Sequence, residues 1–228
     1  MAVSFPLPVK AVIIDLDGTL LDTIPDLAAA ANMMLTELER PVRDEALIRT
    51  FVGKGIANLV QRTLTGTLEG EIDPALHARG LAVFERCYES VNGRHTTIYD
   101  GVKAGLERFA RDGIPLACVT NKSTRYTLPL LDMVGLARYF EHVVAGDTLP
   151  LKKPDPAPLL HAAGLLGIAP GDMLMIGDSL NDTVAARAAG CPVFCVPYGY
   201  NEGHDVRSLD TDAVVETLEE AAGMVRKA

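Results

Sequence analysis

Short apolar runs rich in β-branched residues recur along the chain, and stretches with a helical pattern separate the later ones. Such a run is expected to be a buried strand, and strands that alternate with helices form a parallel sheet covered by helices. The pattern therefore predicts an α/β fold with a Rossmann-like parallel sheet. The expected strands are 11–14, 115–119, 142–145, 173–176 and 193–196, and the expected helices are 102–112, 125–134, 156–166 and 182–189, which end at Gly113, Gly135, Gly167 and Gly190.

The gap between the first and second apolar runs is too long for a single crossover connection. Residues 24–95 show helical patterns and no strand pattern, so they predict a helical cap domain inserted into a core made of residues 1–23 and 96–228. Turn-forming residues at 18–23 and 92–101 mark the expected joints. The cap helices are expected at 24–40, 44–51, 56–64 and 74–88, and a short strand and a helix are expected within 212–228.

Charge and composition exclude several classes of partner. The net charge is −9 and there is no block of Lys or Arg, so neither nucleic acid nor an anionic membrane is expected to bind. No segment approaches the roughly 18 apolar residues of a membrane helix, and no secretory signal is recognisable. The four cysteines form no C-x-x-C pair, which is typical of a reducing compartment. We therefore expect a soluble, cytoplasmic protein.

Acidic residues follow two of the predicted strands. Asp15 and Asp17 follow the first strand, and Asp178 and Asp182 follow the fourth. Ligands of open parallel sheets bind beyond the carboxyl ends of the strands, so these acids are expected to converge. Four carboxylates in one crevice require a hard divalent cation, and all-oxygen ligation favours Mg²⁺. Helix capping is the alternative, and it could explain Asp182 although not all four acids.

A phosphate-binding set is expected at the same edge of the sheet. Thr120 and Asn121 follow the second strand and offer hydroxyl, amide and backbone donors to phosphate oxygens. Lys153 precedes Pro154, which keeps the backbone extended and can aim the lysine inward to supply positive charge. Read alone, the first pair is equally typical of an ordinary turn, and a loop lysine is more often solvated.

Together these residues resemble the four ordered motifs of the haloacid dehalogenase (HAD) superfamily of phosphotransferases, and the resemblance covers nearly the whole chain. Within that superfamily, the helical insertion resembles the cap of the phosphoglycolate phosphatase group, as do residues 188–192 and 198–201. The motifs are Asp15-Leu16-Asp17-Gly18-Thr19-Leu20, Thr120-Asn121, Lys153-Pro154, and Gly177-Asp178-Ser179 with Asp182.

The resemblance implies covalent catalysis on an aspartate. Asp15 would attack phosphorus to form an aspartyl-phosphate, and Asp17 would act first as the acid and then as the base. An acid at the position of Asp17 disfavours dehalogenation, because a halide leaves carbon without needing a proton. The resemblance also implies that Thr120, Asn121 and Lys153 hold the transferring phosphoryl group.

The same resemblance implies a Mg²⁺ site. Asp15, the backbone carbonyl of Asp17, and Asp178 would bind the ion, with Asp182 as a further ligand or as a residue that orients the others. In the expected cap, Lys54 lies between Gly53 and Gly55 and is a candidate for contacting the carboxylate of a small anionic leaving group. A solvent-facing lysine is the equally simple alternative for that position.

Other residues have weaker or open assignments. Arg49 and Arg62 are weaker candidates than Lys54 for the same contact. The pair Asp22-Thr23 is expected only to cap the first cap helix, with Pro25 in its first turn. Residues 200–204 either reach the site or form a surface loop, and the sequence does not favour one of these.

The predicted function is Mg²⁺-dependent hydrolysis of a small phosphorylated metabolite, with 2-phosphoglycolate as the first candidate, by a monomer or homodimer. A sugar phosphomutase similar to β-phosphoglucomutase, with the same four motifs, is the alternative enzyme. A non-catalytic protein that binds a phosphorylated ligand is the alternative from another class. The chain has no G-x-x-x-x-G-K-[ST], G-x-G-x-x-G, G-x-S-x-G or H-E-x-x-H motif, which removes support for ATPase, dehydrogenase and serine-hydrolase functions.

Overall fold

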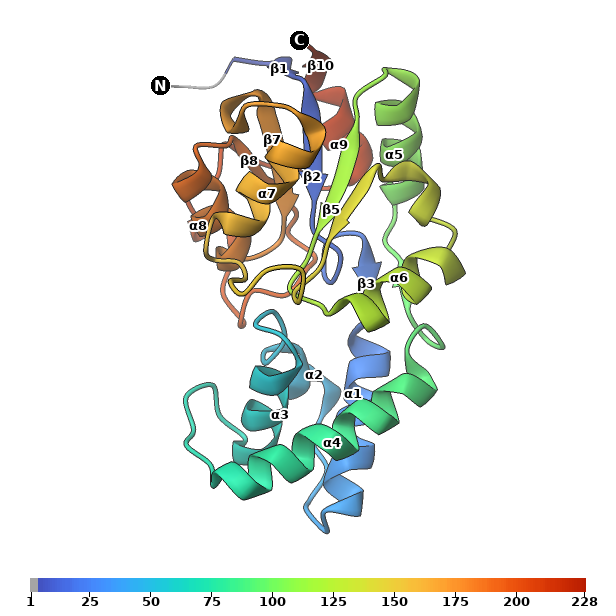
Figure 1. The fold of residues 1–228 in the computed structure, drawn as a ribbon, viewed down its shortest axis with the longest axis vertical. Helices are drawn as coiled ribbons and strands as arrows, with labels where there is room; N and C mark the ends of the chain where they lie inside the picture. The colour runs from blue at the N-terminus through green and yellow to red at the C-terminus, as the bar shows by residue number, and fades with distance from the viewer. Residues whose placement is uncertain (1–3) are drawn as a thin grey trace.

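The computed structural model describes residues 4–228 and shows two lobes (Figure 1). One lobe is built on a six-stranded parallel sheet, and we call it the sheet lobe. The α/β class with a parallel sheet is therefore confirmed. In spatial order the strands are β6 (His142–Val144), β5 (Leu116–Val119), β2 (Ala11–Ile14), β7 (Met173–Gly177), β8 (Val193–Cys195) and β9 (Ala213–Val214).

The strand order explains where a ligand can bind. The chain runs from the central strand β2 outward through β5 to β6, and later crosses back to β7 on the other side of β2. The loops that follow β5 and β7 therefore diverge at the end of β2, which is where open α/β sheets form a crevice. All five predicted strands lie in this sheet, with bounds within a residue of those expected.

Helices cover both faces of the sheet because the strand side chains alternate between two apolar clusters. In β2, Val12 and Ile14 face a cluster with α5, α6 and α9, whereas Ala11 and Ile13 face a cluster with α7 and α8. The helices of the sheet lobe are α5 (Val102–Arg111), α6 (Thr124–Met133), α7 (Ala157–Leu166), α8 (Leu180–Ala189) and α9 (Leu218–Gly223), with short 3₁₀ helices at Ala137–Tyr139, Pro170–Asp172 and Val206–Ser208.

Helix α8 begins two residues before the predicted start. Ser179 is its N-cap, and its side chain and that of Asp182 satisfy each other's backbone N–H groups in a capping box. Leu180 and Asn181, which precede the predicted start, thus belong to the first turn of the helix. The four predicted glycine stops are correct, because each has a positive φ at or just after the end of its helix.

The second lobe consists of four helices, and we call it the helical lobe. They pack around a second hydrophobic cluster, which Tyr126 and Tyr200 of the sheet lobe join. The most extensive packing in this lobe is between the first and last helices, which cross each other in Figure 1. The division of the chain at residues 24 and 95 into separate domains stays a prediction. The helices are α1 (Ile24–Glu37), α2 (Glu45–Arg49), α3 (Ile56–Thr65) and α4 (Pro74–Val91).

Two pairs of short strands were not predicted. The segments that join the lobes pair with each other as β3 (Leu21–Asp22) and β4 (Thr97–Ile98), which are antiparallel. Near the chain ends, β1 (Leu7–Val9) pairs with β10 (Val225–Lys227) in parallel. Each of these four segments contains a proline or polar residue in place of a continuous apolar run, and pairing between distant segments is not a local property. Within residues 4–228 no helix is both long and apolar enough to cross a membrane.

Candidate active site

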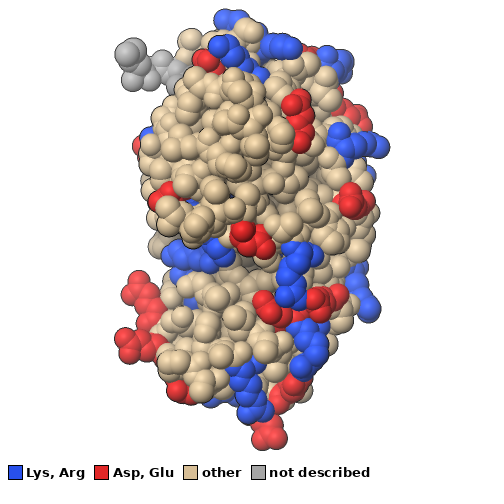
Figure 2. All heavy atoms as spheres, viewed as in Figure 1, with Lys and Arg blue, Asp and Glu red and all other residues tan. Residues whose placement is uncertain are grey.

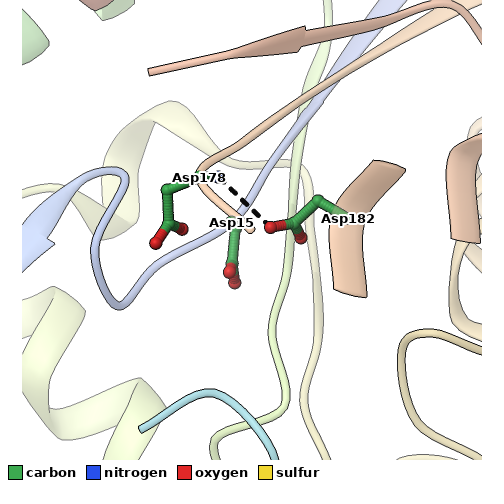
Figure 3. A group of neighbouring side chains, drawn as sticks. All are labelled: Asp15, Asp178 and Asp182. Atoms are coloured by element: carbon green, nitrogen blue, oxygen red, sulfur yellow. Dashed lines mark hydrogen bonds between the residues drawn. The ribbon is translucent and has the colours of Figure 1, made fainter. Parts of the chain in front are cut away.

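Three aspartates converge at the carboxyl end of the central strands. Asp15 directly follows β2, Asp178 directly follows β7, and Asp182 lies in the first turn of α8. One carboxylate oxygen from each lies within 4.8 Å of the other two, and all three residues are buried. Figure 3 shows the three side chains directed toward one shared space. The sequence-based expectation that acids from distant segments meet here is therefore correct for these three.

Asp182 is held by hydrogen bonds to both of its oxygens. Its Oδ2 accepts from the backbone N–H of Asp178 at 3.2 Å (Figure 3). The same oxygen accepts from the backbone N–H of Ser179 at 3.1 Å and from the Ser179 hydroxyl. Its Oδ1 accepts from Lys153 Nζ at 2.7 Å. Asp182 therefore both caps α8 and fixes the positions of its neighbours. The helix-capping alternative from the sequence is confirmed for Asp182.

Asp178 is bound from the opposite side. Its Oδ1 accepts from the Thr19 hydroxyl at 2.8 Å, and its Oδ2 accepts from the backbone N–H of Tyr200. A Cβ at Gly18 would lie 2.4 Å from this carboxylate, and one at Gly199 would lie 2.3 Å from its Cβ, so both loops approach too closely for any side chain. Burial raises the pKa of Asp178 well above its usual range, and the neighbouring carboxylates of Asp182 and Asp15 raise it further.

Lys153 supplies the positive charge inside the cluster. Its Nζ lies 2.9 Å from Asp15 Oδ1 and 2.7 Å from Asp182 Oδ1, and it also donates to the Val119 carbonyl. Burial alone would lower the pKa of Lys153, but the two carboxylates outweigh burial and raise it, so the lysine is charged. The sequence-based expectation that Lys153 points inward is correct.

The charges of the cluster do not balance. Burial raises the pKa of Asp15 to about 7, even though Lys153 acts to lower it, and Asp182 raises it as well. Three carboxylates face one lysine, so their ionised forms leave an excess of negative charge in a buried space. An oxygen-only donor set with excess negative charge is what a hard divalent cation such as Mg²⁺ requires. The residues present therefore fit such an ion.

Asp17 does not join the three. Its Oδ1 accepts from the Thr23 hydroxyl at 2.7 Å and pairs with Lys122 Nζ at 3.1 Å. The expectation that four carboxylates share one ion is thus wrong for the Asp17 side chain, because it pairs with the buried Lys122 instead. The assignment of its backbone carbonyl to the ion stays a prediction.

Thr120 and Asn121 lie at the end of β5, beside the cluster. Thr120 is buried, and its Oγ1 accepts from the backbone N–H of Lys122 at 3.2 Å. The Asn121 amide donates to the carbonyl of Lys153 at 2.8 Å and to that of Gly53, in the helical lobe, at 2.9 Å. The side chain of Asn121 therefore joins the lobes in this structure, and its predicted contact with a phosphoryl group stays a prediction.

A cavity of about 50 Å³ lies between the lobes, and Asp15, Thr120 and Asn121 are among the residues that line it. The sheet lobe contributes polar and charged side chains, and the helical lobe contributes apolar side chains and glycines. Such a small, mixed cavity fits a small ligand with one charged end. Its lining is Asp15, Asp17, Thr120, Asn121 and Lys122 from the sheet lobe and Leu27, Val52, Gly53, Gly55, Ile56 and Leu59 from the helical lobe.

The profile of the haloacid dehalogenase-like hydrolases matches residues 9–190, which include the aspartate cluster and Lys153. The chain belongs to this family. Its membership confirms the resemblance inferred from the four motifs.

Relatives in the family are similar over almost the whole chain. A protein named phosphoglycolate phosphatase from Thiobacillus denitrificans is 56% identical over 225 residues, which cover 99% of each chain. A protein of the same name from Nitrosospira multiformis is 57% identical over 98% of each chain. Among solved structures, a predicted phosphoglycolate phosphatase from Haemophilus somnus has a TM-score of 0.88 and 33% identity, covering 93% of this chain and 96% of that one.

Lys122 is a residue of this HAD-like site that sequence reasoning missed. It is buried, pairs with Asp17, and its Nζ donates to the Tyr88 hydroxyl of α4. Burial alone would lower the pKa of Lys122, but Asp17 and Tyr88 outweigh burial and raise it. Lys122 directly follows Thr120-Asn121 at the end of a predicted strand, and this position could have indicated that it belongs to the site.

Thr23 also has a contact that was not expected. It is the N-cap residue of α1, but its side chain makes no capping hydrogen bond and instead donates to Asp17. The expectation that Asp22-Thr23 only caps the helix is therefore wrong for Thr23. Pro25 does lie in the first turn, as predicted. Tyr200 resolves the open question about residues 200–204, since its backbone N–H reaches Asp178 and its hydroxyl donates to Asp22.

The predicted cap cations lie at the junction of the lobes but outside the residues that line the cavity. Lys54 Nζ lies 2.9 Å from Glu202 Oε1, and Arg62 Nη2 lies 2.7 Å from the same oxygen. Arg49 donates to the carbonyls of Tyr198 and Gly199. Figure 2 shows Lys and Arg side chains gathered at this junction. A contact between Lys54 and a substrate carboxylate stays a prediction.

Proposed function

We propose that this protein is a Mg²⁺-dependent phosphatase that hydrolyses 2-phosphoglycolate to glycolate and phosphate through an aspartyl-phosphate on Asp15. The observation that carries the proposal is the buried Asp15 carboxylate, which lies beside Asp178, Asp182 and Lys153 and also lines the small cavity. The choice of substrate is supported by the relatives named phosphoglycolate phosphatase at 56% and 57% identity.

Asp15 has one oxygen available for attack. Its Oδ1 accepts from the backbone N–H of Leu16 at 2.7 Å and pairs with Lys153 at 2.9 Å. Oδ2 is therefore the oxygen that attacks phosphorus as the bond to the leaving oxygen breaks. Lys153 keeps the carboxylate oriented and offsets the negative charge on the transferring group. Thr120 and the backbone around Asn121 lie where they can bind the phosphoryl oxygens.

Asp17 is placed to move the proton. Thr23 and Lys122 both contact its Oδ1, so Oδ2 is the oxygen that gives a proton to the departing alkoxide. Lys122 then stabilises the carboxylate that remains. In the second half of the reaction, the same oxygen removes a proton from the water that attacks the aspartyl-phosphate, which frees phosphate and restores Asp15.

The metal would be held by Asp15, Asp178 and the backbone carbonyl of Asp17. Asp182 fits the orienting role better than the ligating one, because both of its oxygens already accept hydrogen bonds. When bound, the ion would neutralise negative charge on the phosphoryl oxygens.

The helical lobe would act as a cap that selects the ester. The helical side of the cavity is lined by apolar side chains such as Leu27, Val52 and Ile56, which offer no hydrogen-bond partners to the hydroxyl groups of a sugar, and this disfavours the phosphomutase alternative. The paired placement of Asp15 and Asp17 beside this cavity disfavours a protein that only binds its ligand.

The test is phosphate release from a panel of esters with and without Mg²⁺. We expect 2-phosphoglycolate to have the highest kcat/KM, ahead of glucose 6-phosphate, AMP and p-nitrophenyl phosphate, and we expect all release to stop when the ion is chelated. Interconversion of sugar phosphates without phosphate release would favour the mutase, and ligand binding without turnover of any ester would favour a non-catalytic protein.

A further inference from the structure

One carboxylate of the sheet lobe is enclosed by cations of the helical lobe. Glu202 lies in the loop after β8, and its Oε1 is 2.7 Å from Arg62 Nη2 and 2.9 Å from Lys54 Nζ. Burial would raise the pKa of Glu202, but the two cations outweigh burial and hold it below the usual range. Glu202 has a φ of 50°, a backbone conformation that a non-glycine residue adopts only at a cost.

Arg62 depends on this contact. The residue is 4% exposed, and its guanidinium also donates to the carbonyls of Phe51 and Leu68, within the helical lobe. An arginine cannot lose its proton, so a buried guanidinium needs a carboxylate to offset the loss of hydration. Among residues 4–228, Glu202 is the carboxylate paired with it. Separation of the lobes would hydrate both groups, whereas removal of Glu202 alone would leave a buried charge without a partner.

The contact connects two parts of the site. On one side, Tyr200 lies two residues before Glu202, and its backbone N–H binds Asp178. On the other side, Lys54 lies in the turn whose Gly53 and Gly55 line the cavity. Glu202 therefore ties the turn that closes the cavity to the loop that holds an aspartate of the cluster.

We propose that Glu202 is a positioning residue that docks the helical lobe over the cavity by pairing with Arg62 and Lys54. In this structure Glu202 lies beside Lys54, where the sequence predicts the carboxylate of the substrate. Its kinetic consequence rests on the proposed function, because that consequence is measured as the KM for 2-phosphoglycolate. Its structural consequence does not, since the relative position of the lobes can be measured without substrate.

The experiment compares Glu202→Gln with the wild-type protein. The variant keeps the size of the side chain and loses its charge, so the fraction of molecules with docked lobes should fall. Apparent affinity falls with the fraction of competent molecules, so KM for 2-phosphoglycolate should rise about tenfold while kcat changes less than about twofold. Without substrate, the radius of gyration from X-ray scattering and amide exchange in residues 50–56 should both increase. Glu202→Asp, which keeps the charge, should recover part of each change.

The control is Glu37→Gln, which removes the ion pair of Glu37 with Arg86 on the exposed surface of the helical lobe and should change nothing. Lys54→Met tests the same contact without leaving a buried charge, and it should raise KM by a smaller factor. Unchanged scattering and exchange in Glu202→Gln would overturn the docking role whatever the substrate is. Opening of the lobes in a protein that hydrolyses no phosphoglycolate would support docking and count against the proposed function alone. A lower kcat at constant KM would overturn the positioning role, because a merely destabilised fold behaves in that way.

Discussion

The two lobes line the same cavity with opposite chemistry. The sheet lobe contributes Asp15, Asp17 and Lys122 with their polar neighbours, whereas the helical lobe contributes apolar residues such as Val52 and Ile56. The difference follows from the architecture. Strand ends of a parallel sheet bring polar loops from distant segments to one edge, while the inner face of a helix pair is apolar because it packs a core. Changes in the sheet lobe should therefore alter the rate for every ester, and changes in the helical lobe should alter the choice among esters.

The largest effect is expected from Asp15→Asn. The amide cannot form an acyl-phosphate as the carboxylate does, so kcat should fall at least about 10³-fold for every ester alike. Rates come from phosphate release, and circular dichroism checks that the fold is kept. Asp132→Asn, on the exposed side of α6, is the matched control and should keep full activity. Substantial turnover by Asp15→Asn, or a loss of activity confined to one ester, would contradict the claim that the sheet lobe sets the rate for every ester.

A smaller effect is expected from Ile56→Ala, which removes an apolar wall of the cavity on the helical side. Loss of such contacts typically changes discrimination by about 1–3 kcal/mol. The ratio of kcat/KM for glucose 6-phosphate to that for 2-phosphoglycolate should therefore rise about tenfold.

The matched control is Ile72→Ala, because Ile72 packs on the same helical core as a half-buried residue but does not line the cavity. It should lose similar stability and leave the ratio unchanged. If both variants shift the ratio equally, the wall residues do not select the ester, and selection must lie elsewhere.

The smallest effect is expected on stability. Burial raises the pKa of Asp15 from 3.8 to about 7. A carboxyl with a higher pKa in the folded state binds more protons there, so this group makes the metal-free protein less stable as the pH rises from about 4 to about 7. Mg²⁺ favours the ionised form and should raise the melting temperature, by on the order of 5 °C near pH 7 and by less near pH 5.

Calorimetry gives these melting temperatures, and hydrogen exchange locates the effect. Protection by Mg²⁺ should appear in the loops after β2 and β7 and not in α1 to α4. Equal protection of both lobes, or a stabilisation that does not depend on pH, would contradict a metal site made of buried carboxylates in the sheet lobe.

Much of the fold was predictable because its signals are local. A run such as 173–176 is apolar throughout, and the glycine after each of the sheet-lobe helices α5 to α8 marks its end. The pairs β1–β10 and β3–β4 were missed because their segments are not continuous apolar runs, and because their pairing joins distant segments.

The site divides in the same way. The meeting of Asp15, Asp178 and Asp182 could be predicted from the sequence, because strand polarity in a parallel sheet brings every strand end to one edge, and the inward position of Lys153 followed from the resemblance to the HAD motifs. The contacts of Lys122 and Thr23 with Asp17, and those of Glu202 with Lys54 and Arg62, became visible only in the three-dimensional structure. Those contacts join one lobe to the other or one loop to another. The partner of a charged side chain there depends on how the lobes pack, and no local pattern of residues encodes that packing.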